Sequence, residues 1–370
     1  FFFQFSNTRK IKLQKQKFDP NDEFIQTANN QFFKRKNMSF ISGLVKTLLA
    51  ERVKFKTELD KHTIGSLEYN NAKAQQEIVK EMANSMFGIT ADKESRYFDK
   101  RICEGITLTG QYMLKLAINI FESYQIIPIY GDTDSIFVVV ETENPVEIQK
   151  KINTDLETEL KKRFNLINNI VYLEFEKTFK KFILVEKKRY CGLLSYLDGK
   201  TIDRIFYRGM ESIQKSTIKY TKNKLAQLLK YILYDEKDSI FIKQWLRQLQ
   251  DEFYSKQFNA SEIAITYKVN KPIHSYKTTL PHTRVAKRLI DKKIILDVIE
   301  EKQSWSQIKY IVLDFVKRKE INIDEYNEFF DRDYYWKIKI YSPIKRILNI
   351  VYPEIAWDYL FVNRQQSLFF

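Results

Sequence analysis

Apolar residues in the first part of the chain recur at helical spacing. They stand three or four positions apart over residues 39–60, which predicts an amphipathic helix. Gly65 and Ser66 interrupt this pattern, and a second helix is predicted over residues 71–86. Because a short loop joins the two, we expect an antiparallel helical hairpin. Two further helical patterns follow, over residues 103–122 and 144–164.

A different pattern lies between these last two helices. Ile129–Tyr130 and Ile136–Val140 are β-branched and aromatic runs that suit buried strands. Gly131 and Asp132 are expected to supply the tight turn between them. Asp132 and Asp134 would then stand at a hairpin tip, close enough to share a divalent cation. Mg²⁺ prefers such hard carboxylate oxygens together with substrate phosphates. The same Asp-x-Asp spacing also occurs in turns that are merely solvated.

Strand and helix patterns both occur in the second half of the chain. Residues 171–186 alternate like paired strands, with Glu174 and Glu176 on one face. His282 is expected to be a helix-start or core residue. Helical patterns are recognised over residues 225–233, 240–253, 287–299 and 305–316. The mixture predicts an α+β fold.

The charge balance favours a polyanionic partner. The chain has 62 Lys and Arg against 47 Asp and Glu, a net charge of +15, and each phosphate that a protein neutralises releases counterions. Residues 177–230 hold fourteen Lys and Arg against four Asp and Glu, interleaved with Tyr190, Phe206 and Tyr207. This interleaving favours nucleic acid. No apolar run approaches the length of a membrane span, so no membrane partner is expected.

The cysteines and the first residues indicate an intracellular chain. Cys103 and Cys191 are far apart and form no CxxC, which predicts neither a disulfide framework nor a zinc site. The opening FFFQF is too short for a signal-peptide core. Residue 1 is Phe, so the chain is expected to begin inside a domain or to be processed.

Two stretches carry a resemblance to a known family. Residues 130–135, YGDTDS between two apolar strands, resemble motif C of the family B (α-like) DNA polymerases. Residues 80–88, KEMANSMFG, resemble motif B of the same family, KxxxNSxYG, with Phe87 in the place of the usual Tyr. Arg52 and Lys56 match the R-x-x-x-K of the preceding fingers helix.

The resemblance implies roles for these residues. Asp132 and Asp134 would hold two Mg²⁺ ions for transfer of a nucleotide to a primer 3′-hydroxyl. Lys80 would also protonate the leaving pyrophosphate as a general acid. Phe87 keeps a stacking surface and lacks the hydroxyl of Tyr. The implied nucleotide-binding residues are Arg52, Lys56, Lys80, Asn84 and Phe87.

A third resemblance concerns duplex DNA. Residues 187–190, KKRY, resemble the KKxY motif that grips the primer–template duplex, with lysines on phosphates and an aromatic ring on the sugar backbone. Residues 206–212 resemble the end of the palm, where Gln214–Ser216 replaces the family's Arg-Arg-Asp. The implied DNA-binding residues are Lys187, Lys188, Tyr190, Arg208 and Lys215.

The family also implies an architecture. It has an antiparallel palm sheet with covering helices, two-helix antiparallel fingers and a mainly helical thumb. Residues 1–37 would be an N-terminal stretch of the palm, just after the place of motif A, and residues 38–88 the fingers. Residues 89–211 would be palm and residues 212–370 thumb. Primer–template DNA and deoxynucleoside triphosphates are the implied partners.

One family feature is missing from residues 1–40. No strand there matches motif A, which carries the other metal-binding aspartate, and there is no room for the 3′–5′ exonuclease domain. We therefore expect a C-terminal portion of a polymerase that is a poor catalyst alone. It would be a fragment, a split-gene product, or a subunit whose motif A and exonuclease come from a separate chain. The resemblance implies a nucleus or a viral replication site.

Two other functions are compatible with parts of the sequence. A non-catalytic DNA-binding polymerase remnant or subunit agrees with the missing motif A, although it does not explain why both Asp132 and Asp134 are present. A DxD glycosyltransferase would use the same two carboxylates on a metal–nucleotide sugar. It leaves no role for residues 187–190, and no Gly-rich nucleotide-sugar domain is recognisable. The prediction is therefore a template-directed DNA polymerase.

Overall fold

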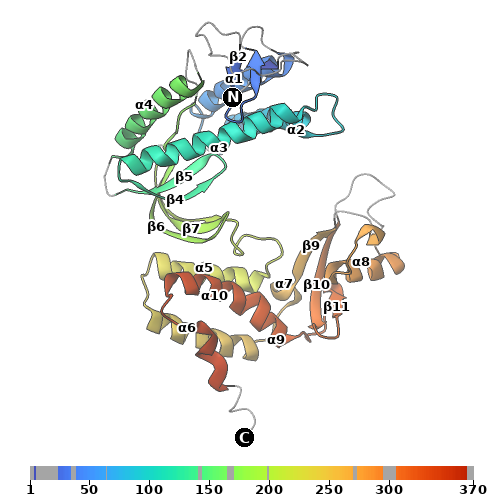
Figure 1. Cartoon of the computed structure of the whole chain (residues 1–370). Helices are drawn as coiled ribbons and strands as arrows, with labels where there is room; N and C mark the ends of the chain where they lie inside the picture. Colours follow the sequence, from blue (N-terminus) through green and yellow to red (C-terminus); the bar gives the residue numbers. More distant parts are fainter. Residues whose placement is uncertain are drawn as a thin grey trace. The chain divides into compact units, whose positions relative to one another are not determined.

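The structure is a computed structural model that describes residues 4–5, 24–34, 39–63, 65–140, 144–164, 171–197, 200–269, 273–294 and 306–364. The chain forms two compact units, residues 1–175 and 176–370 (Figure 1). Helices and small antiparallel sheets occur in both, which confirms the α+β fold class. Within the described ranges, no helix is long and apolar enough to cross a membrane. The boundaries predicted for fingers, palm and thumb rest on the resemblance and stay predictions.

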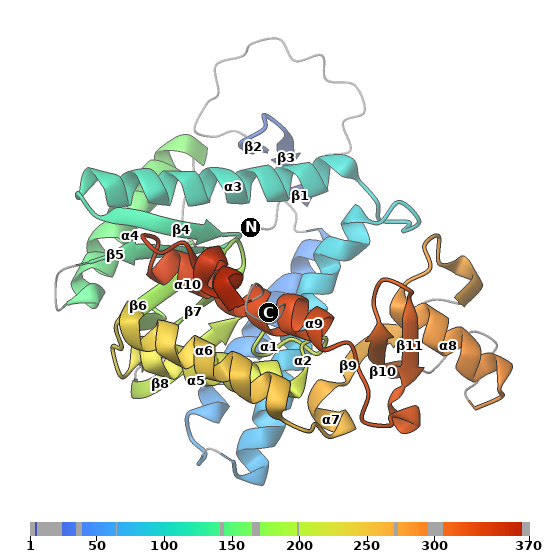
Figure 2. The same cartoon turned by 90° about the horizontal axis from the view of Figure 1, so that it is seen from below.

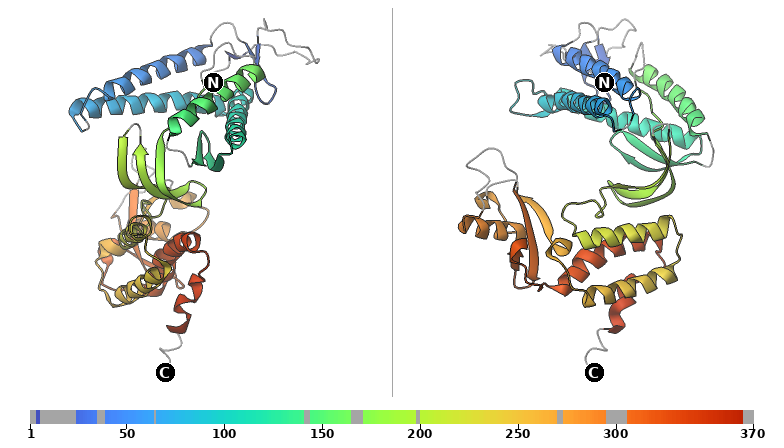
Figure 3. Two further views of the ribbon diagram at one scale, coloured as in Figure 1. Left: turned by 90° about the vertical axis from the view of Figure 1, so that its left-hand side faces the viewer. Right: turned by 180° about the vertical axis from the view of Figure 1, so that it is seen from behind.

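A long helical hairpin dominates the first unit. α1 (Phe40–Leu59) and α2 (Leu67–Ala91) lie side by side (Figure 3). The hydroxyls of Ser39 and Ser66 accept from the backbone amides of Ser42 and Tyr69, at 3.2 and 3.1 Å, and so cap the two helices. α1 agrees with the prediction, whereas α2 is longer at both ends than the predicted range of 71–86.

The core of the first unit lies between two other helices and a strand pair. α3 (Lys100–Ser123) and α4 (Pro145–Phe164) pack together, and the antiparallel hairpin β4 (Ile127–Asp132) and β5 (Ser135–Val139) packs against them through Ile136 and Val138. The hairpin is therefore anchored on one face. The buried residues of this core are Met113, Ala117, Ile120, Phe121, Ile152, Leu156, Leu160 and Phe164.

A small sheet precedes these helices. β1 (Gln4–Phe5), β2 (Phe24–Gln26) and β3 (Phe32–Lys34) are antiparallel in the order β1-β3-β2, and the buried Phe33 lies against Gly105 of α3. The polar pattern of residues 1–37 by itself indicates irregular structure, which is wrong for these strands. They are two or three residues long, too short for an alternating pattern.

The second unit opens with a three-stranded antiparallel sheet. β6 (Lys177–Glu186), β7 (Arg189–Leu197) and β8 (Lys200–Arg208) pair in the order β6-β7-β8. Residues 171–176 form no strand, so the prediction of a strand there is wrong and Glu174 and Glu176 do not share a strand face. The helices α5 (Lys219–Leu233), α6 (Ser239–Ser255) and α10 (Ser342–Val351) are stacked, and one face of the sheet joins their core (Figure 1).

A second sheet interrupts the helices of this unit. β9 (Ile265–Val269), β10 (Ser306–Asp314) and β11 (Lys319–Asn322) are antiparallel, and α8 (Pro281–Asp291) lies beside β10 and β11 (Figure 2). The helix predicted over residues 305–316 is therefore wrong. Its apolar residues fit both a helical and a strand period, and pairing with β9 and β11 selects the strand. The other short elements are α7 (Ala260–Ile263), η1 (Ile273–Ser275), η2 (Ile323–Glu325), α9 (Arg332–Tyr334), η3 (Tyr335–Tyr341) and η4 (Trp357–Arg364).

Residues on α8 correct one further prediction and confirm another. The helix begins at Pro281, six residues before the predicted start at Lys287, because a proline is well accommodated in a first helical turn. His282 is 5% exposed and its ring stacks on Tyr267, with ring centroids 4.6 Å apart. It is a core histidine, as expected.

Candidate active site and nucleic-acid interface

The tip of the β4–β5 hairpin presents the two predicted carboxylates. Asp132 is the last residue of β4 and pairs with Ser135, so the turn consists of Thr133 and Asp134. Gly131 and Asp132, which the sequence placed in the turn, belong to the strand. The Asp134 amide donates to the Asp132 carbonyl at 2.7 Å, and Thr133 has a φ of 57°. Positive φ is rare for a β-branched residue, and such strain gathers at functional sites.

The two carboxylates at this tip differ in exposure. Asp134 is exposed and Asp132 is half-buried, with its Oδ1 accepting from the Thr133 hydroxyl at 3.2 Å. Leu114 and Ile118 of α3 lie under Gly131 and support the tip. In the described part of the chain, no group of three or more His, Cys, Asp or Glu side chains is placed to hold a metal ion.

The donor set nevertheless fits magnesium. Mg²⁺ in nucleotide-processing sites is typically held by one or two carboxylates, with water and substrate phosphates in the other positions. Asp132 and Asp134 meet that requirement from a single turn. The roles of both residues remain predictions.

The predicted triphosphate-binding residues lie on the helical hairpin of the first unit. Arg52 and Lys56 are one turn apart on α1, and Lys80 and Asn84 are one turn apart on α2. At 100° per residue, Phe87 falls on the same side of α2 as Lys80 and Asn84. The Phe87 ring is 39% exposed. Arg52 and Lys56 therefore share one face of α1, and Lys80 and Asn84 share one face of α2.

These cations differ from their neighbours in having no anionic partner. Across the described ranges, the side chains of Arg52, Lys56 and Lys80 make no ion pair. Lys54 on the same helix, by contrast, pairs with Glu51 at 2.6 Å, and Lys61 pairs with Glu58 at 2.8 Å. The unpaired set is therefore available for an external anion.

The predicted duplex-binding lysines form a turn in the second unit. Lys187 and Lys188 connect β6 to β7, because Glu186 pairs with Arg189 across the two strands. Both lysines are exposed, and Lys188 has a φ of 65°. Arg208 pairs with Tyr190 in the β7–β8 register and so lies at the same end of the sheet. Lys215 is exposed in the segment that follows.

Tyr190 occupies a different environment from these cations. Its ring is 8% exposed and packs on Phe182 and Phe206, with centroids 5.4 and 6.2 Å away. Phe179 completes this aromatic cluster, and the ammonium of Lys177 lies 5.0 Å from the Phe206 ring. The predicted contact of Tyr190 with a sugar backbone stays a prediction, and the structure adds a packing role that the sequence did not reveal.

Glu174 and Glu176, considered as further acidic residues near the metals, are both exposed. Glu176 pairs with Lys177 at 2.9 Å. The two residues fall on opposite sides of the boundary between the two units. A metal-binding role for either one stays a prediction.

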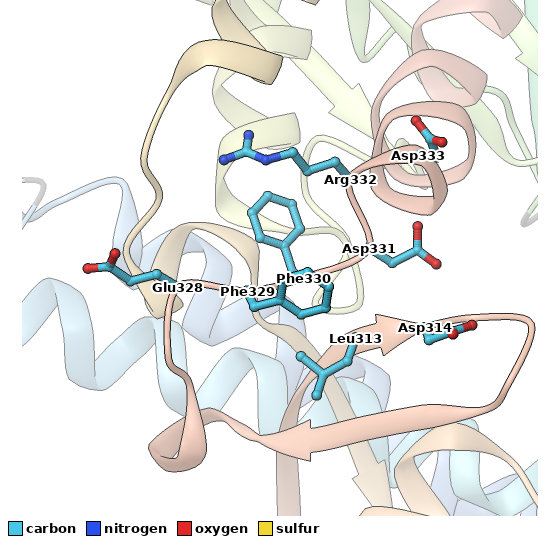
Figure 4. Close-up of a pocket in the computed structure, with 8 residues that line it drawn as sticks. All are labelled: Leu313, Asp314, Glu328, Phe329, Phe330, Asp331, Arg332 and Asp333. Atoms are coloured by element: carbon cyan, nitrogen blue, oxygen red, sulfur yellow. The ribbon is translucent and has the colours of Figure 1, made fainter.

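The second unit also contains a pocket of about 480 Å³ near α9 (Figure 4). Two of its acidic groups already have partners: Asp331 accepts from the amides of Phe315 and Tyr334, both at 2.9 Å, and Asp333 accepts from the Tyr254 hydroxyl at 2.7 Å. None of the predicted site residues lines it. The lining residues are Leu313, Asp314, Glu328, Phe329, Phe330, Asp331, Arg332 and Asp333.

Comparison with known proteins gives a consistent result. The family model described as DNA polymerase family B matches residues 4–351. The DNA polymerase of Thermococcus gorgonarius is 26% identical over 84% of this chain and 39% of its own length. The DNA polymerase delta catalytic subunit of Schizosaccharomyces pombe is 24% identical over 98% of this chain and 34% of its own.

A solved structure agrees in fold. The family B DNA polymerase from Pyrobaculum calidifontis aligns with a TM-score of 0.56 and 21% identity, covering 91% of this chain and 42% of that chain. This chain therefore spans between about a third and two fifths of the length of these three proteins.

Proposed function

This chain belongs to DNA polymerase family B, and on that premise we propose that it carries the nucleotide-binding and duplex-binding parts of a template-directed DNA polymerase. The observation that carries the proposal is the strained hairpin tip with Asp132 and Asp134. A two-residue hairpin turn requires a positive φ at its first residue, and this turn keeps Asp132 and Asp134 two positions apart at one tip.

The reaction is attack of a primer 3′-oxygen on the α-phosphorus of a nucleoside triphosphate. A P–O bond to the primer forms, the bond to pyrophosphate breaks, and the primer hydroxyl gives its proton to solvent water. Asp132 and Asp134 would hold Mg²⁺, which when bound offsets the negative charge on the reacting phosphates. Lys80 is assigned the proton that the leaving pyrophosphate takes up.

The nucleotide is assigned to the helical hairpin. Arg52, Lys56 and Lys80 offer unpaired positive charge to a triphosphate, and Asn84 offers an amide on the same stripe as Lys80. Phe87 provides a partly exposed ring against which a base or sugar can pack. The proposal gives a role to the cations that have no carboxylate partner among the described residues.

The primer–template duplex is assigned to the end of the β6–β8 sheet. Lys187, Lys188, Arg208 and Lys215 are all exposed there or just beyond it, which suits phosphate contacts that carry no sequence information. Tyr190 lies at the same end of the sheet. This grouping supports duplex binding more strongly than a nucleotide-sugar enzyme, which has no use for it.

The proposal includes a further carboxylate. The motif A sequence is not recognisable in residues 1–40. We therefore assign the other metal-binding aspartate, and any exonuclease, to a segment or chain outside the described site. A nucleus or a viral replication site is the proposed setting. The same missing motif favours a second candidate, a DNA-binding polymerase subunit without its own catalysis.

Primer extension tests the proposal. The purified chain is assayed with Mg²⁺, deoxynucleoside triphosphates and a primer–template, beside Asp132→Asn/Asp134→Asn and a DNA-binding measurement. Metal charge stabilisation of several kcal/mol predicts a loss of roughly 10³-fold in the double variant, with duplex affinity unchanged. Duplex binding without extension supports the subunit candidate. Extension that survives in the double variant would contradict the assignment of the two aspartates.

A further inference from the structure

The turn between β6 and β7, Lys187–Lys188, is called the lysine turn below. It is in contact with the segment that follows β8. Lys188 has a left-handed backbone, a conformation that persists only where the surroundings impose it. Gly209, which follows β8, has a φ of 62°, and a Cβ added there would clash with the carbonyl oxygen of Lys188. The two backbones are thus in direct contact. Gln214 donates to the Gly209 carbonyl at 2.8 Å and fixes this segment in turn.

A buried carboxylate fixes the next residue of the turn. The Glu211 side chain is 10% exposed, and its Oε1 lies 3.2 Å from Nη1 of Arg189. Arg189 occupies the variable position of the KKxY motif, between Lys188 and Tyr190. Its guanidinium is directed to Glu211 and, at 2.8 Å, to the exposed Glu186. Arg189 is therefore held by two carboxylates of this chain.

The same carboxylate reaches a helix far along the chain. Oε1 of Glu211 lies 2.8 Å from Nη1 of Arg346, on α10. The neighbouring Met210 is buried in the core that α10 shares. Glu211 thus joins the lysine turn, the end of the sheet and α10 in one ion-pair network. If its charge is removed, Arg346 loses this carboxylate and Arg189 keeps only the exposed Glu186.

We propose that Glu211 is a positioning residue for duplex DNA, acting through Arg189 to hold Lys187 and Lys188 in a phosphate-binding geometry. Arg346 extends this support to α10, so that the lysine turn and α10 are coupled. The inference rests on the proposed function only in taking the two lysines to bind phosphate. Neither Glu211 nor Arg346 needs to touch the DNA.

A double-mutant cycle on duplex affinity tests the proposal with the full chain. A fluorescent primer–template is titrated at several salt concentrations against Glu211→Gln, Lys187→Ala/Lys188→Ala and the triple variant. Losing two phosphate contacts lowers the magnitude of the salt slope by about 1.8, or about 0.9 per phosphate. Glu211→Gln is expected to weaken binding and to lower the slope by part of that amount. In the background without the lysines it should have no further effect, because coupled sites are not additive.

Three further measurements serve as controls for this test. Glu186→Gln, which removes the 56%-exposed partner of Arg189, is the matched control and should leave duplex affinity unchanged. Arg346→Met, at a half-exposed position, removes the other partner of Glu211 and should also weaken duplex binding. It tests the same network if Glu211→Gln does not fold. Nucleotide affinity at α1 and α2 should not change in any of them.

The outcomes separate this inference from the function on which it rests. The positioning role is wrong if Glu211→Gln and Lys187→Ala/Lys188→Ala weaken duplex binding additively, or if Arg346→Met leaves it unchanged. The assignment of the two lysines to duplex binding would remain valid in either case. If the lysine pair itself does not alter affinity or salt slope, the duplex assignment is wrong, and the positioning role is overturned with it.

Discussion

The two regions proposed to bind phosphates present their cations in opposite ways. On α1 and α2, Arg52, Lys56 and Lys80 project from regular helices and have no partner among the described residues. At the end of β6, Lys187 and Lys188 lie on a turn with left-handed backbone that Gly209 and Glu211 support. A helix fixes side-chain spacing by itself, whereas a strained turn needs tertiary contacts to keep its shape.

This difference predicts where mutations should act. In the helical hairpin, function should depend on the cations themselves and be insensitive to their neighbours. Around the lysine turn, residues that never meet DNA should matter as well. The following predictions test that contrast, beginning with the largest expected effect.

Substituting Lys80 should impair chemistry more than binding. Lys80→Arg keeps a positive charge for the triphosphate, but an arginine does not release its proton, so a general-acid contribution of about 10²–10⁴-fold in rate is lost. Single-turnover incorporation, in whichever assembly extends primers, measures the rate and the nucleotide affinity separately. Lys73→Arg on the same helix is the control and should change neither. A normal rate in Lys80→Arg would exclude the proton-transfer role.

Substituting Gly209 should destabilise the second unit. An alanine there meets both a left-handed φ and the carbonyl of Lys188, at a combined cost of about 2–4 kcal/mol. Denaturant unfolding measures it. Gly110→Ala is the control, since this helical glycine has open space around it and should gain up to about 1 kcal/mol. Equal effects of the two substitutions would remove the proposed difference between the regions.

The smallest effect concerns pH and a residue outside both regions. Burial lowers the pKa of His282 below its ordinary value. As pH falls, the imidazole of His282 takes up a proton near pH 6.5 in the unfolded chain and only at lower pH in the folded chain. The stability that neutral His282 contributes is therefore present above about pH 6.5 and is lost below it. Unfolding measured from pH 7.5 to 5 should show this loss. His282→Phe should reduce it, while His62→Gln, in the loop after α1, should leave it intact.

Much of the first region could be predicted from the sequence because its information is local. The helical period placed α1 within a residue or two, and the spacing of Arg52 to Lys56 and of Lys80 to Asn84 fixes their shared faces without any tertiary contact. The hairpin with Asp132 and Asp134 was recognised for the same reason. Its turn was misplaced by two residues because Gly131 is a common turn former, whereas the observed turn uses Thr133.

The second region could be predicted only in part because its supports are distant in sequence. KKRY and the basic composition indicated duplex binding, but the partners of Arg189 lie at Glu211 and, through it, at Arg346. No short pattern joins these positions. Likewise, Ser306–Asp314 becomes a strand because β9 and β11 flank it, a pairing that its own apolar spacing does not specify.

A crossed binding experiment tests the central claim most directly. Duplex affinity, and nucleotide affinity on the preformed duplex complex, are measured for Arg52→Ala/Lys56→Ala and for Lys187→Ala/Lys188→Ala, with Lys54→Ala as the control for a cation already paired with Glu51. In Arg52→Ala/Lys56→Ala we expect nucleotide affinity to fall by about tenfold or more per cation and duplex affinity to stay unchanged. In Lys187→Ala/Lys188→Ala we expect duplex affinity and its salt dependence to fall and nucleotide affinity to stay unchanged. Loss of both ligands in both variants, or of neither, would contradict the division of phosphate binding between the two regions.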